Sequence, residues 1–233
     1  MDNQLFLKKK YEVNTFTCRH RKLTKNQENA LNYYESFIGI HYQEKLINFK
    51  NIFNNEHPVV LEIGFGIGHS LIAQSINYPH LNFIGIEVYL PGIASCLNLA
   101  IKLKVNNLRI IYYNAIKVLN FMIPDRSLLK VQLFFPDPWP KKKHHKRRMV
   151  KIDFAQLILK KLNLNGYFHI ATDSSSYAHE IVSIMNNITG FHRIFYDSIN
   201  LILMRPNTKF EQKAKKSGGI IQDLIYKKIE INF

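Results

Sequence analysis

Three glycines and one acidic residue have the spacing of a nucleotide-cofactor site. Gly64, Gly66 and Gly68 follow the apolar run 59–63, where missing Cβ atoms let the backbone turn sharply and approach a ligand closely. The glycine that a dinucleotide-binding turn needs three positions after Gly66 is absent. Glu62 precedes the turn, and its charge would repel a pyrophosphate but can pair with the ammonium and sulfonium of S-adenosylmethionine. The turn therefore favours S-adenosylmethionine over NAD.

Two further polar residues occur where the next strands should end. Glu87 follows the run 82–86, and a carboxylate there can accept hydrogen bonds from both hydroxyls of a ribose. Asn114 follows the run 108–112, and its amide can both donate to and accept from an adenine edge. Each residue alone could be a solvated loop residue. Because Glu62, Glu87 and Asn114 all lie at or near the ends of successive predicted strands, a cofactor site is favoured.

The segment after the next apolar run combines an acid, an aromatic side chain and a dense positive charge. Prolines at 136, 138 and 140 restrict the backbone around Asp137 and Trp139, the only tryptophan of the chain. The run 141–148 then carries six lysines and arginines and no acid. A core aromatic and a solvated basic loop are the ordinary interpretations. Their position at a strand end beside a cofactor turn favours an acceptor site for a polyanion.

The net charge of the chain is concentrated in three blocks. The chain carries +15 at pH 7, and residues 1–30, 141–148 and 205–219 contribute +4, +6 and +4 of it. Separate basic blocks on a nearly neutral body indicate a nucleic-acid footprint. An anionic membrane is a weaker explanation, because no amphipathic basic helix accompanies the blocks.

Apolar runs alternate with helical patterns along most of the chain, which predicts a mainly parallel sheet. We expect a Rossmann-like α/β fold, with a twisted sheet, helices on both faces and an antiparallel edge. The expected strands are 59–63, 82–86, 108–112, 131–135 and 167–171, with further strands at 191–196, 201–204 and 220–231. One expected helix begins near Asn26, and three others cover 70–73, 94–104 and 154–162. Functional residues should follow the carboxyl ends of the strands.

The length of 233 residues fits one catalytic domain over 58–233, preceded by a basic arm and helix over 1–57. Cys18 and Cys96 are the only cysteines, and they lack the spacing of a disulfide framework or a zinc site. We expect no metal, no export signal, no membrane span and a cytoplasmic location. The oligomeric state is left open, with a monomer among the options.

The sequence resembles the bacterial tRNA (guanine-N7-)-methyltransferases, a family of class I S-adenosylmethionine-dependent enzymes. The resemblance covers nearly the whole chain and is strongest in the Phe-Phe-Pro-Asp-Pro-Trp segment 134–139 with its basic tail. It extends to 61–68, 84–88, 171–173 and 208–211, and to the Arg-x-Arg-x-Leu-Thr-Lys segment that begins at Arg19.

The resemblance implies a role for each matching residue. It assigns Asp137 as the catalytic residue, and it implies cofactor contacts for Glu62, Glu87, Asn114 and Asp137 beside the glycine turn. The substrate would be held by Lys141, Asp173, Thr208, Lys209, Phe210 and Glu211, and RNA by Lys143, His144, His145, Lys146, Arg147 and Arg148. The chain departs from the family at Asn114, where an acid is usual, at Pro140, where His is expected, and at 213–214, where Lys-Ala replaces Arg-Gly.

The expected reaction is methyl transfer from S-adenosylmethionine to N7 of a guanosine in tRNA, with the variable-loop guanosine at position 46 as target. One alternative is a noncatalytic RNA-binding protein with a methyltransferase fold. Another is a methyltransferase acting on a different base position, including an exocyclic amine. Pro136 argues against the amine, because it offers no side-chain acceptor ahead of Asp137.

Overall fold

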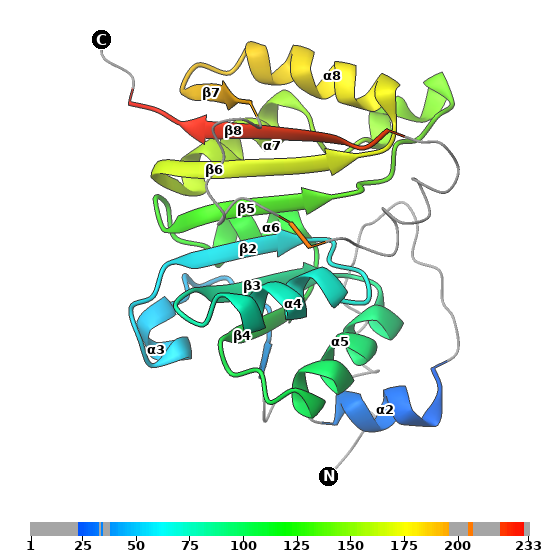
Figure 1. Cartoon of the computed structure of the whole chain (residues 1–233), viewed down its shortest axis with the longest axis vertical. Helices are drawn as coiled ribbons and strands as arrows, with labels where there is room; N and C mark the ends of the chain where they lie inside the picture. Colours follow the sequence, from blue (N-terminus) through cyan, green and yellow to red (C-terminus); the bar gives the residue numbers. More distant parts are fainter. Residues whose placement is uncertain (1–22, 33, 35–37, 196–204, 207–219, 231–233) are drawn as a thin grey trace.

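An eight-stranded sheet organises the protein, in the order β1-β4-β3-β2-β5-β6-β8-β7 (Figure 1). The computed structural model describes residues 23–32, 34, 38–195, 205–206 and 220–230. The strands are β1 (Gly39–Ile40), β2 (Val59–Ile63), β3 (Asn82–Glu87), β4 (Leu108–Tyr112), β5 (Leu128–Phe134), β6 (Leu162–Thr172), β7 (Phe191–Ile194) and β8 (Gln222–Lys228). Pairings from β1 to β6 are parallel, and β8 is antiparallel to both β6 and β7. The predicted mainly parallel sheet with an antiparallel edge is confirmed.

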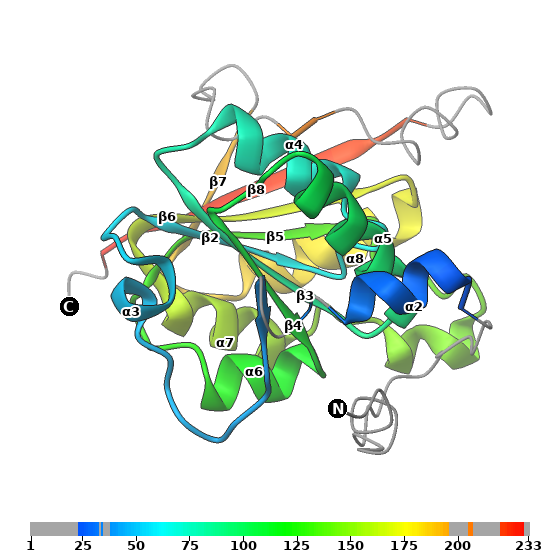
Figure 2. The ribbon, with the colours of Figure 1, turned by 90° about the horizontal axis from the view of Figure 1, so that it is seen from below.

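Helices cover both faces of this sheet. They are α2 (Lys25–Leu31), α3 (Phe49–Phe53), α4 (His69–Asn77), α5 (Leu90–Lys102), α6 (Ala115–Phe121), α7 (Ile152–Lys161), α8 (Ser175–Asn186) and the 3-10 helix η2 (Lys142–Arg147). Helices α4 and α5 lie on one face, and α6 and α7 lie on the other (Figure 2). Strands β2 and β3 are buried at every position, as strands covered on both faces require.

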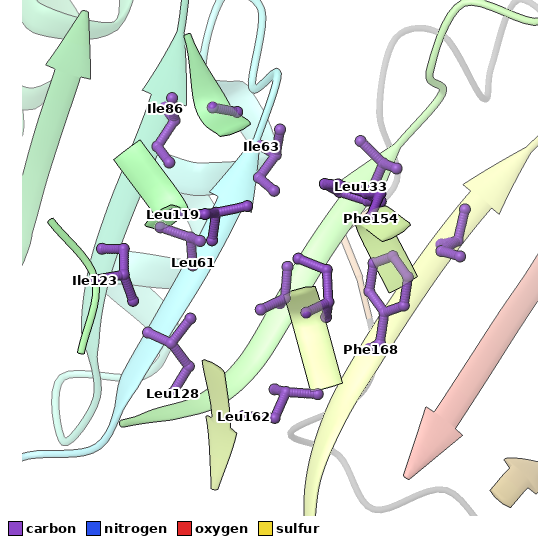
Figure 3. Packing of buried hydrophobic residues seen from close by; sticks show 14 of the residues in the cluster. Leu61, Ile63, Ile86, Leu119, Ile123, Leu128, Leu133, Phe154, Leu162 and Phe168 are labelled. Atoms are coloured by element: carbon purple, nitrogen blue, oxygen red, sulfur yellow. The ribbon is translucent and has the colours of Figure 1, made fainter. Parts of the chain in front are cut away.

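The apolar core has a part on each face of the sheet. On the α6–α7 face, side chains from β2, β5 and β6, among them Leu61, Leu133 and Phe168, meet Leu119 and Phe154 (Figure 3). On the other face, a second cluster joins the sheet to α2, α4 and α5. The segment before residue 58 contributes to the first part through Ile47 and Phe53, and β1 extends the sheet beside β4.

Several element boundaries differ from the sequence prediction for local reasons. Helix α5 begins at Leu90 rather than at residue 94, because Pro91 occupies the first turn, where a proline loses no helical hydrogen bond. Helix α2 begins after Thr24, which forms a capping box with Gln27. Helices α6 and α8 were not expected, and both begin after a side-chain cap, Asn114 and Ser174 respectively.

The predicted strand 201–204 and residue 196 of the predicted strand 191–196 lie outside the described residues, as does most of the basic arm. Among the helices that the structure describes, none is both long and apolar enough to cross a membrane.

Candidate cofactor and RNA site

The predicted cofactor residues follow the carboxyl ends of neighbouring strands. The glycine turn follows β2, Glu87 ends β3, Asn114 comes shortly after β4 and Asp137 follows β5. These four strands are adjacent and parallel, in the order β4-β3-β2-β5. Their carboxyl ends therefore meet at one edge of the sheet, the edge at which doubly wound folds bind ligands.

The glycine turn is held open by backbone conformation and by hydrogen bonds to β3. Gly64, Gly66 and Gly68 have φ values of 71°, 59° and 78°, in the left-handed region that other residues rarely adopt. The Gly64 amide donates to the carbonyl of Ile86 at 2.8 Å. A Cβ atom at Gly64 or Gly66 would meet nothing within 4 Å. The turn thus presents open backbone, as close approach of a ligand requires.

The Glu87 carboxylate fixes the turn to the start of α5. Its Oε2 accepts from the Gly66 amide at 2.7 Å, and its Oε1 accepts from the amides of Val88 and Tyr89 at 2.7 and 3.0 Å. A carboxylate has about four acceptor positions, so these three bonds leave room for one more on Oε2. Burial raises the pKa of Glu87, the three backbone bonds oppose this, and the nearby Asp137 carboxylate raises it further.

Glu62 is a buried acid whose Oε2 has no hydrogen-bond partner among the described residues. Burial raises its pKa to about 8, with Lys130 acting in the opposite direction. A carboxyl group buried without full compensation is costly in its charged form. A cation arriving beside it would remove that cost. Glu62 is therefore equipped to bind an ammonium or sulfonium group.

A row of polar side chains behind Glu62 was not recognised in the sequence. Glu62, Gln132 and His169 occupy paired positions on β2, β5 and β6, so they share one face of the sheet. Gln132 exchanges hydrogen bonds with Gln74 of α4, at 2.6 and 3.1 Å. Lys130, two residues earlier on β5, is fully buried on the same face, and burial lowers its pKa to about 7. The signal in the sequence that could have revealed this row was Lys130, a lysine within an otherwise largely apolar strand.

The row continues to the antiparallel edge. His169 Nε2 lies 2.8 Å from Oδ1 of Asp223 on β8, and Arg205 binds both oxygens of that carboxylate at 2.8 and 3.1 Å. The Arg205 guanidinium lies 5.4 Å from the centre of the ring of Phe135, the residue that directly precedes Pro136. Burial lowers the pKa of His169 to about 4, although Asp223 raises it. Asp223 keeps its charge because its two partners hold its pKa well below the usual range against the effect of burial.

Asn114 has a structural task besides its predicted one. Its Oδ1 accepts from the amides of Ile116 and Lys117 at 2.9 and 3.2 Å and so caps α6. The expected adenine contact of Asn114 stays a prediction. Beside it, the rings of Tyr42 and Tyr113 are stacked, with centroids 3.7 Å apart.

The proline-rich segment after β5 has a constrained backbone and an exposed acid. Phe135 and Trp139 have φ values of 52° and 45°, which are unusual for aromatic residues and concentrate strain beside Asp137. The Phe135 amide donates to the carbonyl of Ala171 at 2.7 Å, which ties the segment to β6. Asp137 itself is exposed. The arrangement presents this carboxylate at the strand edge near Glu87.

The basic run forms an exposed 3-10 helix beside Trp139. Lys141, Lys142, Lys143 and Lys146 are exposed, whereas His144, His145 and Arg147 are half-buried. The Arg147 guanidinium lies 4.9 Å from the centre of the Trp139 ring, and the His144 ring meets that indole edge-on at 5.8 Å. Exposed lysines with an aromatic–arginine stack suit contact with nucleic-acid phosphates and bases.

Arg148 differs from the rest of the run. Its side chain is 1% exposed and forms an ion pair with Glu180 of α8. A guanidinium buried in this way is turned into the protein and is not presented to RNA. The prediction that Arg148 contacts RNA does not fit this burial. The sequence alone could not separate Arg148 from the rest of the run, because it does not show which basic side chains are buried.

The predicted substrate residues fall into two groups. Asp173 is exposed between β6 and α8, at the same sheet edge as Asp137. Thr208, Lys209, Phe210 and Glu211 lie outside the described residues, as do the departures at 213–214. In the described part of the chain, no three or more His, Cys, Asp or Glu side chains are grouped as metal ligands would be.

Comparisons with known proteins agree with this geometry. A protein family described as "Putative methyltransferase" matches residues 56–224. The tRNA (guanine-N(7)-)-methyltransferase of Vibrio parahaemolyticus is 45% identical over 221 residues, covering 94% of this chain and 92% of that protein. The protein of the same name from Buchnera aphidicola subsp. Schizaphis graminum is 46% identical over 230 residues, covering 97% and 94%.

Solved structures show the same fold at low sequence identity. The 16S rRNA methyltransferase KamB matches with a TM-score of 0.56 and 11% identity, over 83% of this chain and 99% of that one. An rRNA methylase from Streptococcus thermophilus matches with a TM-score of 0.50 and 10% identity, over 78% and 92%. The sheet order, the strand-edge site and the extent of the sequence match together show that this chain belongs to the tRNA (guanine-N(7)-)-methyltransferase family.

Proposed function

We propose that this chain transfers a methyl group from S-adenosylmethionine to N7 of a guanosine in tRNA, the variable-loop guanosine at position 46. The observation that carries the proposal is the position of Asp137. It connects a cofactor-type strand edge, with Glu62, the glycine turn and Glu87, to an exposed basic helix. The names of the relatives that match over more than 90% of this chain support the same activity.

The residues at the strand edge fit S-adenosylmethionine. The buried Oε2 of Glu62 lacks a partner among the described residues and would pair with the methionine ammonium. The open turn at Gly64 and Gly66 leaves space for the chain of the cofactor, and Glu87 Oε2 can accept from one ribose hydroxyl. Asn114 would contact the adenine. When bound, S-adenosylmethionine supplies an electrophilic methyl group on a sulfonium.

The chain itself has to position the guanine rather than remove a proton. Guanine N7 already carries a lone pair, so no general base is needed. Asp137 would hold the base in line with the methyl donor and stabilise the positive charge that develops on the ring. Asp173, at the end of the neighbouring strand β6, would bind the guanine edge from the other side together with residues 208–211.

The basic residues would bind the tRNA backbone. Phosphate contacts by Lys141, Lys143, Lys146 and Arg147 orient an RNA without reading its bases, and the half-buried His144 and His145 complete the same surface. Selection of the target guanosine would then depend on the small site between Asp137 and Asp173. We infer a cytoplasmic enzyme, because its tRNA substrate is found there.

The decisive test is incubation of the protein with unmodified tRNA and methyl-labelled S-adenosylmethionine, followed by chemical cleavage at 7-methylguanosine. Cleavage in the variable loop supports the proposal, and label at an exocyclic amine would replace it with the alternative base position. Asp137→Ala should lower turnover about 100-fold or more, in the range found for groups that stabilise transition-state charge.

The second candidate, a noncatalytic RNA-binding protein with this fold, makes a different prediction. Such a protein should show no change in melting temperature when S-adenosylmethionine is added. The enzyme should be stabilised by the cofactor according to mass action. The Oε2 atom of Glu62, which has no hydrogen-bond partner among the described residues, and the open glycine turn favour the enzyme.

A further inference from the structure

Two adjacent arginines at the end of the basic run differ in their burial and in their contacts. Arg147 lies over the Trp139 ring and is half-buried, whereas the side chain of Arg148 is 1% exposed. Identical residue types in consecutive positions therefore have different surroundings. Only the surroundings of Arg147 leave it accessible to a polyanion.

Arg148 makes three contacts that join the proline-rich segment to α8. Its Nε donates to the carbonyl of Pro138 at 2.8 Å, directly after Asp137. Its Nη1 donates to Oε2 of Glu180, and its guanidinium carbon lies 4.8 Å from the centre of the Tyr177 ring. One side chain thus bonds both the backbone beside Asp137 and the first half of α8.

The partners of Arg148 are themselves fixed. Tyr177 is fully buried, its amide donates to Ser174 Oγ at 3.4 Å, and its hydroxyl accepts from the Val150 amide at 3.1 Å. Ser174 caps α8 and directly follows Asp173. The contacts of Arg148 therefore run from the neighbour of Asp137 to the neighbour of Asp173.

We propose that Arg148, Glu180 and Tyr177 form a clamp that sets the position of Asp137 relative to Asp173. The three are positioning residues and not RNA contacts. The catalytic meaning of the clamp rests on the proposed function, because it is there that Asp137 and Asp173 hold the guanine.

Simple energetics explains why the clamp needs an arginine. A charge-assisted hydrogen bond is roughly twice as strong as a neutral one, and the planar, five-donor guanidinium can donate to a carbonyl and a carboxylate while stacking on a ring. Without Arg148, the Pro138 carbonyl loses its donor and the positive-φ backbone at Trp139 loses a restraint. The segment would then sample positions in which Asp137 is displaced, and displacement by about 1 Å can cost about 100-fold in rate.

The test compares Arg148→Met with Lys143→Met, which removes one charge from an exposed position of the same run. Trp139 is the only tryptophan, so its fluorescence reports on this segment without any catalytic assay. Arg148→Met should lower kcat by about 10- to 100-fold. It should also increase acrylamide quenching of Trp139 and leave the salt dependence of tRNA binding unchanged. Lys143→Met should leave Trp139 quenching unchanged, raise the Kd for tRNA and reduce the salt slope by about 0.7 to 0.9.

Glu180→Gln provides a milder variant in case Arg148→Met unfolds. Glutamine keeps an acceptor oxygen for Nη1 of the buried Arg148 but removes its counter-charge, so the hydrogen bond weakens and kcat should fall about fivefold. The proposal is overturned if Arg148→Met reduces the salt slope as Lys143→Met does, or if both clamp variants leave kcat and Trp139 quenching unchanged. If the unaltered protein methylates no tRNA, the proposed function fails, while the quenching comparison still decides whether the clamp holds the segment.

Discussion

Binding of S-adenosylmethionine should release a proton from Glu62. Burial raises the pKa of Glu62 to about 8, so most of this group is protonated at pH 7. In the proposed site, the cofactor ammonium would pair with the carboxylate form only. Binding at neutral pH therefore has to ionise Glu62, and the proton leaves to the solvent.

The size of the effect follows from the pKa. Each pH unit below 8 adds about 1.4 kcal/mol to the cost of ionising the group. Cofactor affinity should therefore rise roughly tenfold between pH 6 and pH 7. Above this range the α-amino group of the cofactor begins to lose its own proton, with a pKa of about 8, and the rise should level off.

Calorimetric titration at pH 6.5 in two buffers of different ionisation enthalpy measures the protons released, and we expect about one per cofactor bound. Glu62→Gln should lower affinity about tenfold or more at pH 8, and it should abolish both the proton release and the rise with pH. Lys130→Met should retain the rise and move it to higher pH, since Lys130 holds the pKa of Glu62 down. Equal affinities at pH 6 and pH 7 with no proton release would refute the assignment of Glu62 as the ammonium partner.

Three further predictions concern the turn, the buried histidine and the basic helix. Gly92→Ala would place a Cβ 2.3 Å from the Gly66 carbonyl oxygen, so it should destabilise the fold by about 1–3 kcal/mol and reduce the thermal shift caused by the cofactor; an unchanged shift would count against this contact. His169 has its pKa lowered to about 4, so the stability it contributes is present above its unfolded pKa of about 6.5 and is lost as pH falls through 4. Denaturant unfolding should record a loss of about 3 kcal/mol in the free energy of unfolding between about pH 6.5 and pH 4, and the His169→Gln variant should not show this loss. Replacing Lys143 and Lys146 together by Met should reduce the salt slope of tRNA binding by about 1.4 to 1.8, and an unchanged slope would exclude them as phosphate contacts.

The strands that carry the site could be predicted from the sequence because their signal is local. Runs such as Val59–Ile63 and Leu108–Tyr112 are mainly apolar, with one charged residue each, and the structure places β2 and β4 on those residues. The glycine turn after β2 is equally local, since it depends on backbone conformations that glycine adopts most easily. Because β4, β3, β2 and β5 are adjacent and parallel, residues that follow their carboxyl ends lie at the same edge of the sheet.

The boundaries and short helices were harder to predict. Pro91 and Gly92 resemble a turn in the sequence, yet they form the start of α5, where Gly92 allows close contact with Gly66. Helices α6 and α8 depend on the caps Asn114 and Ser174, and a single capping residue is a weak signal in a sequence. These features depend on what packs nearby as much as on the residues themselves.

The sequence by itself determined the fold class, the strand-edge position of Glu62, Glu87 and Asp137, and the concentration of positive charge after β5. Only the tertiary structure decided which charges are buried. Lys130 and His169 join Asp223 in a polar network across β5, β6 and β8, and Arg148 is buried against α8, unlike the exposed lysines of the same run. The physical reason is that burial and pairing of a charge depend on residues distant in the sequence, whereas strand and turn propensities depend on adjacent ones.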